Sequence, residues 1–156
     1  MQSRIEGIVI RVLSRHEDSR GWLLELFRQD ELSEALHPVM GYISSTKPGV
    51  TRGPHEHRQQ TDVFCFTGSA PFRLYLWDNR PESSTHGARE RLEIPAGEYV
   101  SLIVPAGVVH AYRNVGPTDG LVFNFPNRLY AGQKRREEVD EIRHEDDPNS
   151  PFRIDD

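Results

Sequence analysis

Cysteine, long apolar runs and excess positive charge are all scarce in this chain of 156 residues. The single cysteine, Cys65, cannot form an internal disulfide and lies in an apolar run, so we expect a buried thiol in a cytoplasmic protein. No apolar run approaches the roughly 18 residues of a membrane span, so no membrane contact is expected. The formal net charge of −5 argues against a broad basic surface for a nucleic acid polymer.

Turn-forming residues, in contrast, are frequent. Twelve glycines and 11 prolines separate short segments rich in β-branched and aromatic residues. This spacing predicts an all-β sandwich or barrel, and the length suits a single domain over 1–156. Residues 72–77 look apolar on both faces, as in a strand inside a sandwich. The expected strands are 5–13, 22–27, 39–45, 62–67, 72–77, 99–104, 109–114 and 121–125.

Helical signals are weak and peripheral. Residues 30–36 could form two turns, with Asp30 as the N-cap and Pro38 just beyond the end. Residues 133–147 carry dense charge of both signs, which predicts a short surface helix or an ordered tail. Trp22 and Trp77 stand in apolar strand contexts, so we expect both in the core.

Three of the seven histidines lie in a pattern that suggests chemistry. His55 and His57 are two residues apart, so on an extended strand both side chains point to one face. Asp62 follows closely, and His110 comes much later, just after Pro105 and Gly107. The string G-x5-H-x-H-x4-D-x5-G, followed by P-x-G-x2-H-x3-N, resembles the two motifs of the cupin superfamily. That resemblance implies a jelly-roll β-barrel with these side chains at its mouth.

Two kinds of chemistry are open to these four side chains. His55, His57, Asp62 and His110 could hold one divalent transition metal and leave positions free for a substrate. Alternatively the site holds no cofactor, and a neutral histidine acts as general base on a C–H beside a ketone.

Four segments, in order along the chain, resemble one family. Residues 18–28 (DSRGWLLELFR) are similar to D-x-R-G-x-F-x-E-x-F, and 49–55 (GVTRGPH) to G-V-L-R-G-L-H. Residues 76–87 are similar to V-D-L-R-x-x-S-P-T-F-G, and 103–110 to I-P-x-G-F-A-H. These are motifs of the dTDP-4-dehydrorhamnose 3,5-epimerase family. The resemblance implies an isomerase of deoxysugar and cell-wall polysaccharide biosynthesis, acting on a nucleotide-diphosphate sugar.

The resemblance also implies roles for individual residues. His55 matches the general base that removes a proton beside the keto group of a nucleotide-linked 4-keto-6-deoxyhexose. His57 joins it as a second catalytic histidine through a resemblance to the sugar-nucleotide 3,4-ketoisomerases, which use two histidines. Arg52 and Arg20 reach the diphosphate, Arg20 from the neighbouring subunit of a homodimer. The remaining residues assigned to substrate binding are Glu25, His110 and Tyr130.

Several departures from the family pattern keep other functions open. Phe123 stands about where the family has a tyrosine that acts as the acid, and Leu23 replaces an aromatic residue expected on the thymine. The chain ends without the family's C-terminal carboxylate, so we expect the base to lack its partner. His57 replaces a common glutamine, as in sugar-nucleotide 3,4-ketoisomerases. The alternatives are therefore such an isomerase, a metal-dependent cupin enzyme, or a non-catalytic sugar-binding cupin.

Overall fold

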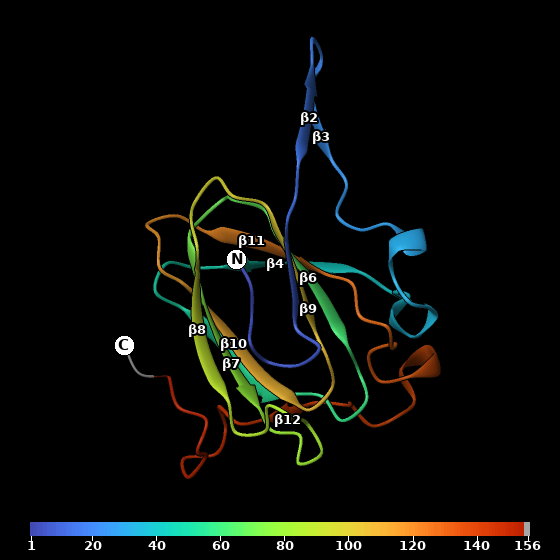
Figure 1. Ribbon diagram of the computed structural model, residues 1–156, viewed down its shortest axis with the longest axis vertical. Coiled ribbons are helices and arrows are strands. Elements are labelled where there is room, and N and C mark those ends of the chain that lie inside the picture. The colour runs from blue at the N-terminus through green and yellow to red at the C-terminus, as the bar shows by residue number, and fades with distance from the viewer. Residues whose placement is uncertain (155–156) are drawn as a thin grey trace.

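The computed structural model describes residues 1–154, and strands dominate them (Figure 1). Two antiparallel five-stranded sheets hold most of the strand residues, which confirms the all-β prediction. Sheet one has the order β1 (Val9–Val12), β9 (Val100–Val104), β6 (Asp62–Phe66), β11 (Gly120–Asn124), β4 (Tyr42–Thr46). Sheet two has the order β12 (Ile142–Arg143), β5 (Thr51–Glu56), β10 (Val108–Asn114), β7 (Phe72–Asp78), β8 (Arg89–Ile94).

The main core lies between the two sheets. Phe64 and Phe66 of β6 meet Phe72 of β7 and Tyr112 of β10 across the sheets, with ring centroids 5.2 to 5.8 Å apart. These contacts are edge-on, a geometry that adds about 0.5–1.5 kcal/mol per pair to the burial of apolar area. The aromatic layer holds the two sheets together.

A second, smaller core covers the outer face of sheet two. Tyr75 and Trp77 of β7 are buried there, and Phe152 and Ile154 of the C-terminal tail pack against this cluster. Residues 72–77 are thus buried almost throughout, as their two-sided apolar character predicted. The tail is held on the barrel by this packing.

A two-stranded hairpin stands apart from both sheets (Figure 1). It consists of β2 (Arg15–Asp18) and β3 (Gly21–Leu24). Trp22 and Leu23 are 53% and 59% exposed on it, so the prediction of a core position is wrong for Trp22 and right for Trp77. An isolated hairpin is marginally stable in water, which makes this exposed apolar surface notable.

The predicted helices are shorter than expected. Residues 30–36 form two separate 3₁₀ turns, η1 (Gln29–Glu31) and η2 (Glu34–Leu36). Residues 133–147 contain one 3₁₀ turn, η3 (Gln133–Arg135), followed by irregular chain and then β12, so an ordered tail is present. Among the described residues, every helix is too short to cross a membrane.

Candidate active site

A cavity of about 1220 Å³ opens at one end of the two sheets. His55 and His57 both line it, so the expectation that the two imidazoles share a face is confirmed. Their ring centroids are 5.8 Å apart, and the ring of His110 lies 4.4 Å from His55 and 6.0 Å from His57. Strand pairing therefore joins residues 55, 57 and 110, which are distant in sequence, in one cluster.

The local sequence explains how β5 and β10 come so close. His110 is the Cα partner of His55 in the antiparallel register. Gly53, two residues earlier, has φ +84°, and a Cβ there would lie 2.5 Å from the carbonyl oxygen of His110. Only glycine both adopts this positive φ readily and leaves room for the His110 carbonyl oxygen at this distance. The R-G-P-H segment thus brings the His55 backbone against β10.

Asp62 forms the floor of the cluster. It is 1% exposed, and its Oδ1 accepts hydrogen bonds from Gln60 Nε2 (2.9 Å) and Asn124 Nδ2 (2.8 Å). Its Oδ2 lies 3.1 Å from His57 Nε2 and 3.6 Å from His110 Nε2. Burial alone would raise the pKa of Asp62, but these neighbours outweigh it and lower the pKa to about 2. Asp62 is therefore a buried negative charge at neutral pH.

The three imidazoles differ in charge. Burial opposes the charge of His57, but the contact with Asp62 outweighs burial and raises its pKa. Burial lowers the pKa of His110, whose Nδ1 donates to the carbonyl of Val108. Burial and the neighbouring imidazoles lower the pKa of His55 to about 2. His55 is thus neutral at physiological pH, while His57 has the greatest tendency to be positive.

Carboxylates accompany His55, contrary to the expectation that the base would lack a partner. Glu141 and Glu145 of the tail place their Oε1 atoms 3.9 and 4.0 Å from His55 Nδ1. The expectation was wrong because residues 142–143 form β12, which pairs with β5 next to His55. A positive charge on His55 would be stabilised by both carboxylates.

The tail is fastened around the site by buried polar contacts. His144 Nε2 lies 2.9 Å from Glu56 Oε1, which also accepts a hydrogen bond from Asn79. The Asp140 carboxylate accepts hydrogen bonds from the backbone N–H groups of residues 58–60. The backbone carbonyl oxygen of Asp140 contacts His57 Nδ1. The tail therefore forms one wall of the cavity.

The other predicted site residues divide into two groups. Arg52 and Tyr130 line the large cavity, and Arg52 is oriented by Thr46 Oγ1 and the carbonyl of Ser45. Arg20 instead lies on the projecting hairpin, paired with Asp18, with 86% of its side chain exposed. Within one chain Arg20 is not a cavity residue.

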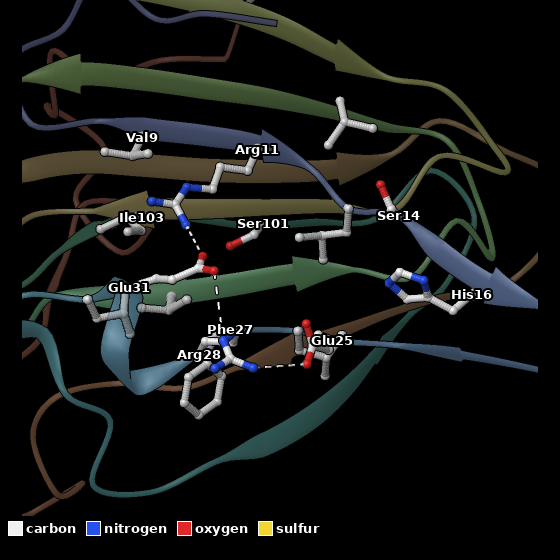
Figure 2. Close-up of a pocket in the computed structure, with 15 residues that line it drawn as sticks. Val9, Arg11, Ser14, His16, Glu25, Phe27, Arg28, Glu31, Ser101 and Ile103 are labelled. Carbon is white, nitrogen blue, oxygen red and sulfur yellow. Dashed lines mark hydrogen bonds and ion pairs between the residues drawn. The ribbon is translucent and has the colours of Figure 1, made fainter.

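Glu25 is also outside the large cavity. It lines a separate cavity of about 280 Å³ beside β1, where it contacts Arg28 (Figure 2). Glu31 lies between Arg11 and Arg28 there, so the charges of this second cavity are already paired within the chain (Figure 2). The structure does not bring Glu25 together with His55.

Some residues that line the large cavity were not predicted as site residues from the sequence. Arg58 and Arg128 add positive charge to the cavity wall, and Tyr42 adds a phenol. Arg58 follows the H-x-H motif directly, a position that could have signalled it. Nothing local marks Tyr42 or Arg128, because their places depend on sheet register and loop path.

The metal alternative can be tested against the donor atoms. His55, His57 and His110 each offer a ligand atom, and these atoms lie within 4.8 Å of one another. His57 Nδ1 contacts the backbone carbonyl of Asp140, as the second nitrogen of a metal-bound histidine usually does, and its Nε2 lies beside Asp62, the fourth candidate ligand. The donor set is therefore compatible with a metal.

A family model described as dTDP-4-dehydrorhamnose 3,5-epimerase matches residues 2–147. The chain belongs to the dTDP-4-dehydrorhamnose 3,5-epimerase family. It is also 34% identical over 127 residues to the spore coat polysaccharide biosynthesis protein SpsL of Bacillus subtilis (strain 168), covering 81% of this chain and 82% of that protein. As a member of this epimerase family, the chain is an enzyme of the isomerase class, as predicted.

Solved structures agree on the fold of this epimerase-family enzyme. A dTDP sugar isomerase from Desulfovibrio desulfuricans G20 superposes with a TM-score of 0.79 at 22% identity, covering 96% of this chain and 91% of that one. The 3'-monoepimerase ChmJ from Streptomyces bikiniensis, in complex with dTDP-quinovose, superposes with a TM-score of 0.73 at 21% identity, covering 83% of this chain and 68% of that one. The predicted cupin jelly-roll fold is confirmed.

Proposed function

We propose that this enzyme moves a proton at a carbon next to the keto group of a nucleotide-linked 4-keto-6-deoxyhexose, with His55 as general base. The observation that carries the proposal is a neutral imidazole in the wall of a large cavity with two carboxylates about 4 Å from its Nδ1. When His55 accepts the proton, Glu141 and Glu145 stabilise the imidazolium. Family membership supplies the sugar-nucleotide chemistry.

His57 suits a different role in the same step. Removal of the proton moves negative charge onto the keto oxygen, and a preorganised positive group lowers the energy of that enolate. His57 has a raised pKa and lines the cavity within 6 Å of the His55 ring. We propose that its positive charge stabilises the enolate oxygen through space, because both of its nitrogens contact Asp140, Asp62 and Gln60. His110, packed against His55, orients the base and the sugar.

The phosphates would bind to arginines. Arg52, Arg58 and Arg128 line the cavity, and a guanidinium pairs two phosphate oxygens at once. The related ChmJ structure contains a dTDP-sugar, which supports this class of substrate. Tyr130 lines the same cavity and forms part of the substrate wall.

A homodimer would explain the residues that lie outside the cavity. The hairpin projects from the body and carries Arg20 with exposed Trp22 and Leu23 (Figure 1). We propose that this hairpin packs on a second copy, which buries the apolar side chains and brings Arg20 to the partner's phosphates. Glu25 would then act at that interface. The buried lone Cys65 accords with a reducing cytoplasm.

We propose that the reaction needs no metal, because the neutral His55 and the positively inclined His57 supply the base and the enolate stabilisation by themselves. Elemental analysis and activity after chelation test this. About one equivalent of a transition metal per chain, with activity lost on chelation, would support the metal-dependent alternative instead.

The test of the main proposal is isotope exchange. The protein is incubated in deuterium oxide with dTDP-4-keto-6-deoxyglucose, and the ring protons are followed by NMR. We expect deuterium at C3, C5 or both, and loss of exchange in His55→Asn. His86→Asn, an exposed histidine outside the cavity, is the matched control. Absence of exchange in the wild-type protein would refute the proposal, and exchange at C3 alone would indicate a partial epimerase or a ketoisomerase.

A further inference from the structure

Inversion at carbon needs an acid as well as a base. If His55 removes a proton from one face, the new proton must arrive on the opposite face, so the donor must come from another wall of the cavity. His55 belongs to β5 of sheet two. A donor on sheet one, across the cavity, meets this requirement. This inference rests on the function proposed above.

Phe123 is not the inward-facing residue of β11. Its ring stacks on Phe125 and its Cα partner on β4 is Ile43, which is 52% exposed. The next residue, Asn124, is 2% exposed and reaches Asp62. The inward position of this strand therefore carries an amide that cannot serve as the acid.

A tyrosine stands directly beside that amide on the neighbouring strand. Tyr42 of β4 is the Cα partner of Asn124, so the two side chains share the inward face of sheet one. The Tyr42 oxygen lies 2.8 Å from Asn124 Nδ2, and Tyr42 lines the same cavity as His55. At 47% exposure the side chain is open to a bound molecule.

The hydrogen bonds determine where the phenol proton points. The carboxylate of Asp62 can only accept, so Asn124 must turn its NH₂ group toward Asp62 Oδ1. The same nitrogen then donates its second hydrogen to the Tyr42 oxygen. Tyr42 is an acceptor in this contact, and its own O–H hydrogen is left for another acceptor. Burial raises the pKa of Tyr42 to about 12, so the phenol keeps that hydrogen at neutral pH.

We propose that Tyr42 is the catalytic acid that delivers the second proton. His55 takes the proton from the carbon beside the ketone, and the C–H electron pair forms the enolate. The Tyr42 O–H bond then breaks as the enolate carbon forms a new C–H bond on the opposite face and the ketone returns. The resulting tyrosinate and imidazolium recover their resting states by exchanging one proton through water, so no co-reactant is consumed.

Other tyrosines fit this role less well. Tyr112 is 5% exposed, is packed among Phe64, Phe66 and Phe72, and its hydroxyl contacts Ser44. Tyr130 belongs to the loop after β11, where its backbone N–H contacts Met40 Sδ, and it is 56% exposed. Tyr42 alone among these three has its oxygen held by the Asn124–Asp62 pair.

The experiment separates exchange from inversion. With the substrate in deuterium oxide, the wild-type protein should give deuterated, inverted sugar. Tyr42→Phe should lower inversion by about 100-fold or more, as expected for loss of a general acid. His55 still exchanges its proton with solvent in this variant, so deuterium should enter sugar of unchanged configuration. Tyr99→Phe makes the same chemical change outside the cavity and should leave both rates unchanged.

The possible outcomes are distinct. Inversion at the wild-type rate in Tyr42→Phe, or loss of inversion only in Tyr130→Phe, would overturn the assignment. Loss of exchange and inversion together in a Tyr42→Phe protein with the wild-type thermal transition would also overturn it, since binding rather than proton delivery would have failed. Absence of exchange in the wild-type protein would instead refute the function of His55.

Discussion

Asp62→Asn tests the buried charge beneath the histidine cluster. The replacement keeps an oxygen to accept from Gln60 and Asn124, so it removes mainly the negative charge that faces His57. The pKa of Asp62 is about 2, against an ordinary value of 3.8. At 1.36 kcal/mol per pKa unit, this difference corresponds to about 2 kcal/mol of folding free energy at neutral pH.

The assay is urea unfolding followed by circular dichroism. For a domain of this size, a loss of about 2 kcal/mol lowers the urea midpoint by about 1 M. Because the pKa of Asp62 is lower in the folded state, its stabilisation is complete above the unfolded-state pKa near 4 and is lost as the pH falls toward 2. The difference in urea midpoint between the variant and the wild type should therefore become smaller as the pH falls from 4 toward 2.

A second measurement follows the imidazoles. The contact with Asp62 is what raises the pKa of His57, so NMR titration should show a lower pKa for His57 in Asp62→Asn. Asp119→Asn, an exposed carboxylate that contacts Ser45, is the control and should change stability by less than about 0.5 kcal/mol. An unchanged urea midpoint for Asp62→Asn, or a difference that does not depend on pH, would refute the reasoning.

Two further predictions concern the C-terminal tail. Glu141→Gln combined with Glu145→Gln should lower the deuterium exchange rate about tenfold, because about 1.4 kcal/mol of stabilisation of the His55 imidazolium is lost. Glu82→Gln, on the surface, is the control. An unchanged exchange rate in the double variant would contradict this prediction. Phe152→Ala should remove the ring that packs on Trp77 and cost about 2 kcal/mol, which lowers the thermal midpoint by about 4–8 °C. A thermal midpoint equal to that of the wild type in calorimetry would show that the tail does not stabilise the barrel.

Much of the fold could be predicted from local patterns. Short β-branched and aromatic segments between glycines and prolines predicted most of the sheet strands, because alternation and turn residues act over a few positions. Three strands of the two five-stranded sheets escaped this reasoning: β5, β8 and the two-residue β12. β5 contains Gly53 and Pro54, which look like a turn, and β8 (RERLEI) is largely charged because it is an edge strand.

The sequence by itself determined the family, the all-β class and the spacing of His55 and His57, because each of these is a property of residues near one another in the chain. Only the tertiary structure decided which charges meet. The carboxylates at His55 depend on the pairing of β12 with β5, and the contact of Tyr42 with Asn124 depends on the register of β4 against β11. A shift of one residue in that register would turn Tyr42 to the other face, so long-range hydrogen bonding, rather than local sequence, places the groups that complete the site.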